Sequence, residues 1–155
     1  MRAILRLVLV LALIPAGLSL GAVAAEAADD PGILVIHGAD GRDHRFTVEL
    51  ARTEKEREYG LMNRSSMPPD HGMLFDFGKD APVYMWMKDT LIPLDMLFID
   101  RTGKIAAIAQ RAVPMSETII PSAAPVRAVL ELNGGTAERL HIAIGDRVGH
   151  PMFAP

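Results

Sequence analysis

The chain contains 155 residues, carries a formal net charge of −3 at neutral pH and has no cysteine. Disulfide bonds, thiol chemistry and thiolate metal sites are therefore excluded. The net charge is slightly negative and no basic run is interleaved with aromatic residues, which disfavours a nucleic-acid-binding surface.

The first 27 residues are predicted to be a secretory signal peptide that is cleaved. Arg2 and Arg6 precede an apolar run over residues 7–14, and two Ala-x-Ala cleavage sites follow at residues 22–24 and 25–27. An uncleaved membrane anchor is the alternative, but a membrane span needs roughly 20 apolar residues and this run ends sooner, at a proline. We therefore expect a periplasmic or secreted protein with no membrane span after cleavage. Because cleavage removes two arginines and one glutamate, the mature chain has a net charge of −4.

The remainder of the chain, residues 28–155, is predicted to form one compact, monomeric domain. About 125 residues are enough for one hydrophobic core and too few for two ordinary domains. Short apolar stretches separated by Gly, Pro, Asn and Asp predict strands over residues 33–37, 46–51, 72–77, 83–87, 94–99, 104–109 and 126–132, and a closing strand that follows residues 145–148. A tight hairpin is expected at residues 100–103, a turn at 78–82, and an irregular, proline-containing stretch at 113–125.

Two short helices are expected between the strands. Thr53 and Glu56 form a capping-box pattern, in which each residue satisfies the backbone N–H of the other, so a helix is predicted from Glu54 to about Leu61. A second helix of one to two turns is predicted to begin at Thr136, with that threonine as its N-cap. Many short strands at even spacing favour a mainly β (α+β) fold, either a single-domain antiparallel β-sandwich or a partly closed barrel with one or two short helices.

Five linked motifs stand out along the domain. In chain order they are GLMNR at residues 60–64, GMLFDF at 72–77, WMKDTLIPLDMLFID at 86–100, VLELNGG at 129–135 and GDRV at 145–148. With these motifs the chain resembles the bacterial and archaeal domain of unknown function 192 family, from about Ile33 to Phe153. The resemblance implies a compact, mostly-β and often secreted single domain. The family brings no agreed activity, so the resemblance implies a fold and not a mechanism.

The segment 87–95, between two predicted strands, is the richest in polar groups. Lys88, Thr90 and Asp95 supply a cation, a hydroxyl and a carboxylate there, and loops held by rigid strands are where binding groups concentrate. Arg64 follows the first predicted helix and could join them. We therefore expect a pocket in which Arg64 and Lys88 hold a polar or anionic small molecule, while Asp95 orients the ligand or one of the cations.

The same residues also allow a purely structural interpretation. Asp95 could cap the loop amides of residues 90–93, and Arg64 could form an ion pair with Asp95 that locks the helix against the sheet. A buried pair of this kind is costly to break from one side. The substitution Asp95→Asn separates the two interpretations, because a ligand-binding role predicts loss of binding with little loss of folding.

Glu131 is a further candidate because it interrupts the apolar strand 126–132. A solvent-facing carboxylate is the simple explanation. If the side chain faces the region of Lys88 instead, it becomes a ligand-holding group or a general acid or base, and a raised pKa in a cleft would mark such a role. Trp86 alternates with its neighbours in strand 83–87. We expect this indole in the core, whereas an exposed indole would indicate a sugar- or partner-binding face.

No cofactor and no metal site are predicted. Thioethers can bind Cu(I), and eight methionines follow the signal peptide, but most of them lie in apolar stretches, as core-filling methionines do. The five histidines show no zinc-binding spacing such as H-E-x-x-H. The sequence also contains no nucleophile elbow, phosphate-binding glycine loop or Ca²⁺ loop.

The interpretation favoured by the sequence is a binding module rather than an enzyme. Its pocket would include Arg64, Lys88, Thr90 and Asp95, with Glu131 as a further ligand-binding residue. The partner would be an unidentified polar or anionic small molecule, or a protein of the cell envelope. Two alternatives stay open. One is a small enzyme that acts on an envelope component with Asp95 or Glu131 as acid or base, and the other is a structural or protein-interaction module with no small-molecule site.

Overall fold

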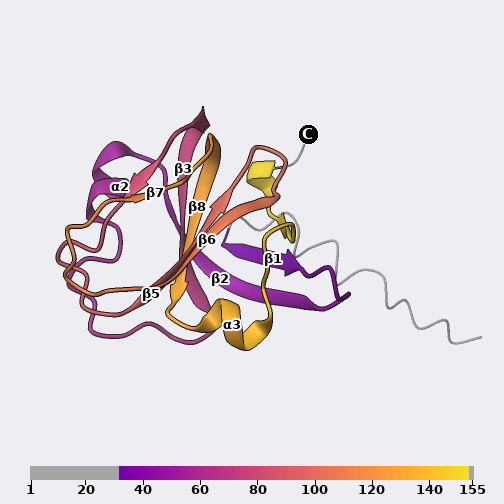
Figure 1. Cartoon of the computed structure of the whole chain (residues 1–155), viewed down its shortest axis with the longest axis horizontal. Helices are drawn as coiled ribbons and strands as arrows, with labels where there is room; N and C mark the ends of the chain where they lie inside the picture. The colour runs from indigo at the N-terminus through magenta and orange to yellow at the C-terminus, as the bar shows by residue number, and fades with distance from the viewer. Residues whose placement is uncertain (1–31, 154–155) are drawn as a thin grey trace, which may run out of the picture.

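The computed structural model describes residues 32–153 of the chain (Figure 1), so the predicted signal peptide lies outside the described residues. The elements in chain order are β1 (Ile33–His37), β2 (Asp43–Ala51), α2 (Glu54–Tyr59), β3 (His71–Ala81), β4 (Tyr84–Met85), β5 (Leu94–Ile99), β6 (Ile105–Ala112), β7 (Ile120–Pro121), β8 (Val126–Asn133), α3 (Thr136–Leu140) and β9 (Arg147–Gly149), followed by a 3-10 turn (Pro151–Phe153).

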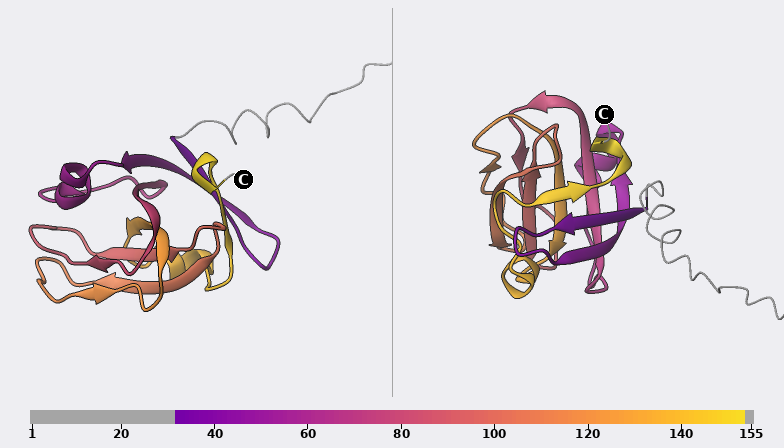
Figure 2. Two further views of the ribbon diagram at one scale, coloured as in Figure 1. Left: turned by 90° about the horizontal axis from the view of Figure 1, so that it is seen from above. Right: turned by 90° about the vertical axis from the view of Figure 1, so that its right-hand side faces the viewer.

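Seven of the strands form one sheet in the order β6-β5-β8-β3-β2-β1-β9, and β4 pairs with β7 in a small second sheet. The large sheet curls into a half-barrel, which Figure 2 shows from two further directions. The two edges of this sheet, β6 and β9, approach each other. Lys104, which precedes β6, and Arg147 of β9 form an isolated antiparallel bridge, and the Val148 N–H donates to the Gly103 carbonyl at 2.7 Å. The prediction of a mainly β, partly closed barrel with short helices is confirmed.

One strand pair departs from the predicted antiparallel arrangement. Strands β2 and β3 are parallel, with Thr47 opposite His71 and Ala51 opposite Phe75. Parallel neighbours cannot be joined by a tight hairpin, and the connection between these two strands contains α2. The sheet is therefore mixed.

Helix α2 begins where the capping box predicts it. The Glu56 N–H donates to the Thr53 hydroxyl at 3.2 Å, and the Thr53 N–H donates to the Glu56 carboxylate at 2.8 Å. The helix ends at Tyr59 rather than near Leu61, because Gly60 takes a φ of +47° that an L side chain rarely adopts.

Several predicted boundaries are wrong: β2 begins at Asp43 instead of residue 46, β6 ends at Ala112 instead of residue 109, and the closing strand β9 already begins at Arg147. Strand β3 continues through the predicted turn at residues 78–82 as far as Ala81, with a register shift after Asp76. The predicted strand 83–87 is only two residues long, and β7 lies inside the stretch that was expected to be irregular. Each short strand exists because it pairs with the other, and such a long-range pairing leaves no local sequence pattern.

The half-barrel has a hydrophobic core on each face of the sheet. The inner core contains Leu34, Ile36, Phe46, Val48, Leu74, Leu97, Ile99, Ile105, Ala128, Leu130, Leu132, Ala137, Ile142 and Val148. The outer core contains Ala51, Leu61, Met73, Phe75, Val83, Met85, Met87, Ile92, Leu94, Met96, Phe98, Ala112, Val126 and Val129. Because successive side chains of a strand face opposite sides, Asp95 of β5 points with Leu97 toward the inner core. Glu131 of β8 points with Val129 toward the outer core.

No helix among residues 32–153 has the length and apolar composition needed to cross a membrane.

Candidate functional site

Glu131 lies on the outer face of β8, opposite Met73 of β3 on one side and Met96 of β5 on the other. Only 4 % of the residue is exposed, so the simple explanation of a solvent-facing carboxylate is wrong. Within residues 32–153 the Glu131 side chain has no hydrogen bond or ion pair. In the same part of the chain no fully buried side-chain nitrogen or oxygen lacks a partner. The carboxyl group must therefore open onto an adjacent cavity.

That cavity, called here the Glu131 cavity, lies between the sheet, the end of α2 and the loop that follows β4. Its volume is about 20 Å³, which is room for one water-sized occupant. It brings together three of the five predicted site residues, Lys88, Thr90 and Glu131. The complete lining is Arg57, Glu58, Tyr59, Gly60, Leu61, Met62, Phe75, Met85, Trp86, Lys88, Thr90 and Glu131.

Burial raises the pKa of Glu131 to about 8. The cause is desolvation, which disfavours the charged carboxylate in an apolar environment. At neutral pH the group is therefore mainly protonated and can both donate and accept a hydrogen bond. It becomes a carboxylate when a cation or a base enters the cavity and compensates the buried charge.

The rim of the Glu131 cavity carries an indole and an ammonium group. The Lys88 Nζ atom lies 5.3 Å from the centroid of the Trp86 ring, a cation–π distance. Trp86 is 41 % exposed, so the expectation that its indole lies in the core is wrong; Met85 and Met87 occupy the buried positions of this segment instead. The Thr90 hydroxyl donates to the Lys88 carbonyl at 3.1 Å and holds the loop together.

Arg64 does not line the Glu131 cavity. Its guanidinium group pairs with the Glu49 carboxylate through both terminal nitrogens, with a distance of 2.7 Å from Nη2 to Oε2. The hydrogen bond from Arg64 lowers the pKa of Glu49. The predicted ion pair between Arg64 and Asp95 is therefore wrong, and Arg64 connects the end of α2 to β2.

Asp95 is completely buried on the opposite face of the sheet. Its Oδ1 atom accepts from the N–H groups of Arg111 at 2.8 Å and Gly135 at 2.9 Å, and its Oδ2 atom accepts from the Ala137 N–H at 2.8 Å. It does not cap residues 90–93 as the structural interpretation predicted. Asp95 instead satisfies the start of α3, where Gly135 is the N-cap residue and has no capping side chain. The predicted capping role of Thr136 is therefore also wrong.

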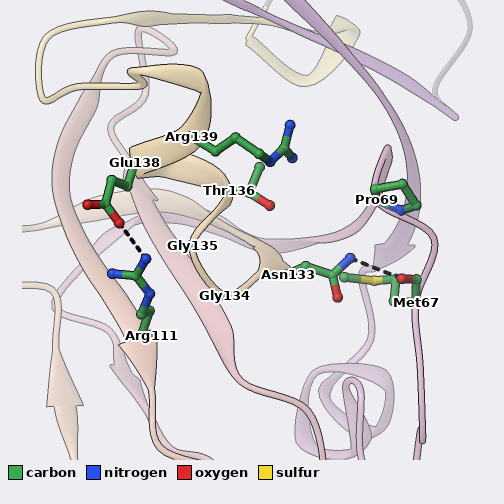
Figure 3. Close-up of a pocket in the computed structure, with 9 residues that line it drawn as sticks. All are labelled: Met67, Pro69, Arg111, Asn133, Gly134, Gly135, Thr136, Glu138 and Arg139. Atoms are coloured by element: carbon green, nitrogen blue, oxygen red, sulfur yellow. Dashed lines mark hydrogen bonds and ion pairs between the residues drawn. The ribbon is translucent and has the colours of Figure 1, made fainter.

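A larger cavity of about 490 Å³ lies beside the start of α3 (Figure 3). Arg111 and Glu138 form an ion pair on one side of it, and the Asn133 side chain donates to the carbonyls of Met67 and Pro68 on the other, both at 3.0 Å. None of the predicted site residues lines this cavity. The sequence did not predict it because its lining comes from three separate segments of the chain, and only the NGG sequence at residues 133–135 marked the place.

No group of three or more His, Asp or Glu side chains is arranged to hold a metal ion among residues 32–153.

The lining of the Glu131 cavity also shows which sequence signals were informative. Glu131 was identified because a carboxylate interrupted an apolar strand, whereas Met62, Met85 and Tyr59 carried no signal that separated them from ordinary core or surface residues.

Comparison with known proteins identifies the family. Residues 35–150 match the model of the DUF192 family, described as "Uncharacterized ACR". A crystal structure of a Sinorhizobium meliloti 1021 protein, described as a candidate transcription regulator, is 56 % identical, covers 75 % of this chain and 90 % of its own, and has a TM-score of 0.74. A Novosphingobium aromaticivorans DSM 12444 protein of unknown function is 42 % identical, with coverages of 75 % and 82 % and a TM-score of 0.72. No match was found among curated proteins. Because the family model spans most of the domain, the chain belongs to the DUF192 family.

Proposed function

We propose that this DUF192 protein is an exported binding module whose ligand enters the Glu131 cavity. The observation that carries the proposal is the carboxyl group of Glu131, a residue that is only 4 % exposed; the group lacks a hydrogen-bond partner among the described residues and opens onto a cavity. A buried polar group without a partner costs about 1–3 kcal/mol. A ligand that pairs with Glu131 recovers that free energy on binding, and the predicted signal peptide supports the exported location.

The chemistry of the cavity favours a ligand with a small cationic or hydrogen-bond-donating group. The floor is a carboxyl group, and the nearby walls include the apolar side chains of Leu61 and Phe75. A volume of about 20 Å³ holds one small group, so the remainder of any larger ligand would lie at the rim. Lys88 and Trp86 stand there and offer an ammonium group and an aromatic face to polar or anionic parts of that ligand.

The description of the Sinorhizobium protein as a candidate transcription regulator is not carried over to this chain. DNA binding depends on unpaired basic groups that replace condensed counterions. Here the net charge is −3, and several arginines are paired with carboxylates, including Arg64 with Glu49, Arg111 with Glu138 and Arg127 with Asp76.

The proposal is tested by thermal unfolding of three proteins, the wild type, Glu131→Gln and the control Glu117→Gln, which changes an exposed carboxylate. The panel contains amines, amino sugars, cell-wall fragments, peptides and inorganic cations. A ligand at about 100 times its dissociation constant stabilises the folded protein by roughly 2.7 kcal/mol. We expect a ligand that raises the unfolding midpoint of the wild type and of the control but not of Glu131→Gln. Equal shifts in all three proteins place the ligand elsewhere, and a flat panel favours the protein-interaction module.

The raised pKa of Glu131 favours one second candidate function, a small enzyme that uses this residue as a general acid or base. A carboxyl group with a pKa of about 8 is suited to proton transfer near neutral pH. Asp95 is a weaker candidate for this role, because three backbone N–H groups already occupy its oxygens. Product formation from an envelope component, lost in Glu131→Gln and kept in Glu117→Gln, would establish the enzyme.

A further inference from the structure

The methionines of this protein are concentrated on one face of the sheet. Four of them, Met73, Met85, Met87 and Met96, are buried members of the outer core, the face to which Glu131 points. The inner core has no methionine among its buried members. Flexible methionines used only to fill gaps have no reason to prefer one of the two cores.

Two of these thioethers flank Glu131 within the sheet. Met73 of β3 and Met96 of β5 are its direct neighbours in the register of β8, and directly opposed residues have Cβ atoms about 4.5–5.5 Å apart on the same face. Long side chains at that spacing are within reach of each other. The buried carboxyl group of Glu131 is therefore bordered by sulfur-containing side chains on both sides.

Two other thioethers line the cavity itself, from outside the seven-stranded sheet. Met85 of β4 and Met62, which follows α2, line the Glu131 cavity together with the carboxyl group. Met85 is buried, and Met62 is partly exposed. Two thioethers and one carboxyl group thus line a space of about 20 Å³, which admits a single ion, a water molecule or one small group of a larger ligand.

We propose that the Glu131 cavity is a binding site for a soft monovalent cation of the Cu(I) class, held by Met62, Met85 and Glu131 with Met73 and Met96 beside them. This inference rests on the proposed function, because it names the ligand class of the same cavity. Thioethers are soft ligands that select Cu(I) over hard divalent ions. The carboxylate supplies the single negative charge that neutralises a monovalent cation in an apolar environment. Binding exchanges the carboxyl proton for the cation, and no electron is transferred.

The surroundings of the cavity agree with a monovalent soft ion rather than with Zn²⁺ or Ca²⁺. Those ions take several His, Asp or Glu ligands, and no such group exists among residues 32–153. The charged groups nearest the cavity are Arg57, Glu58 and Lys88. The Lys88 ammonium group lies over the Trp86 ring at the rim, and Arg57 donates to the backbone carbonyls of Arg52 and Asp76.

The test uses Ag(I), a redox-stable ion of the same charge and softness, followed by Cu(I) under anaerobic conditions in competition with a Cu(I) chelator. Calorimetric titration of the wild type is expected to give one equivalent of bound Ag(I), and ¹³C-methyl methionine spectra are expected to shift for Met62, Met85, Met73 and Met96. Zn²⁺ is expected to produce neither effect. A wild type that binds no Ag(I), or that binds it with shifts only at exposed Met115, overturns the inference.

The matched variants are Met62→Leu/Met85→Leu and, as control, Met115→Leu/Met152→Leu, since leucine keeps the apolar volume of methionine. The first variant is expected to lose at least tenfold in Ag(I) affinity and the control to keep the wild-type value. Equal affinities in the two variants overturn the inference. Glu131→Gln is a second test variant that does not alter the apolar core, and its Ag(I) affinity is also expected to fall at least tenfold. If an organic ligand depends on Glu131 while Ag(I) does not bind, the proposed function stands and only the soft-cation inference falls.

Discussion

Asp95 Oδ2 accepts a hydrogen bond of 2.8 Å from the backbone N–H of Ala137, 42 residues further along the chain. Together with the bonds from the Arg111 and Gly135 N–H groups to Oδ1, this contact ties β5 to β6 and to the start of α3. The carboxylate thus replaces the N-cap side chain that α3 lacks, and both of its oxygens are committed to the fold. Asp95, the carboxylate expected to orient a ligand in the polar segment 87–95, is therefore a structural residue.

Asp95→Asn is expected to destabilise the protein by about 1–3 kcal/mol, because an amide NH₂ in place of one oxygen cannot accept and leaves at least one buried backbone N–H unpaired. This reverses the outcome that a ligand-binding role predicts for the same substitution. Denaturant titration measures the change, with Asp89→Asn as control; Asp89 lies in the neighbouring loop, at a φ of +52° that asparagine tolerates. Unchanged stability of Asp95→Asn would contradict the capping role.

Glu131→Gln is expected to be more stable than the wild type at neutral pH. Burial raises the pKa of Glu131 to about 8 in the folded protein, against about 4.3 in the unfolded chain. Between these values the folded state binds more protons than the unfolded state, so the free energy of unfolding of the wild type falls as pH rises. The group costs almost nothing below about pH 4 and roughly 3.5 kcal/mol at pH 7, and the cost levels off above pH 8.

Denaturant titrations of the wild type and of Glu131→Gln across pH 4–9 check this prediction. The two free energies of unfolding should converge at the acidic end and diverge up to about pH 8. Parallel curves would mean that the carboxyl group is solvated or paired in solution. The control Glu117→Gln changes an exposed carboxylate and should follow the wild type throughout.

Trp86 is the only tryptophan of the chain, and its fluorescence should report the occupancy of the Glu131 cavity. Because the indole is 41 % exposed at the rim, its emission is expected near that of a solvated indole, with efficient quenching by acrylamide. A ligand in the cavity should change the intensity and reduce the quenching. A blue-shifted emission that acrylamide does not quench would contradict the exposed position.

Arg64→Ala is expected to lower the free energy of unfolding by no more than about 1 kcal/mol, because its ion pair with Glu49 joins side chains that are 34 % and 55 % exposed. The variant should also bind every Glu131-dependent ligand as the wild type does, since Arg64 lies outside the cavity lining. A double-mutant cycle with Glu49→Ala measures the coupling between the two residues. Loss of ligand binding in Arg64→Ala would restore the arginine to the site.

The sequence predicted the elements whose signals are local. Strands Ile33–His37 and Leu94–Ile99 were predicted with their observed ends, because alternating or continuous apolar residues stop at turn-forming residues. The capping box placed the start of α2 for the same reason, since both of its hydrogen bonds join residues three positions apart. The hairpin between β5 and β6 also depends only on neighbouring residues.

The site could be predicted only in part. Lys88 and Thr90 were found through their position in a polar loop, and Glu131 through its conflict with an apolar strand. The sequence could not place Arg64 against Glu49 or Trp86 at the surface, because these outcomes depend on which strand lies next to which. A change of one position in strand register would move Glu131 to the other face of the sheet.

The sequence by itself determined the family, the mainly β architecture, the capping of α2 and the absence of disulfides, because motifs, periodicity and composition act within a few residues of each other. Only the tertiary structure decided the roles of the two central acids. Register placed Asp95 against N–H groups 16 to 42 residues away, where its oxygens are satisfied. The same sheet placed Glu131 among apolar side chains and thioethers, where the loss of hydration raises its pKa and leaves a carboxyl group that a ligand can pair.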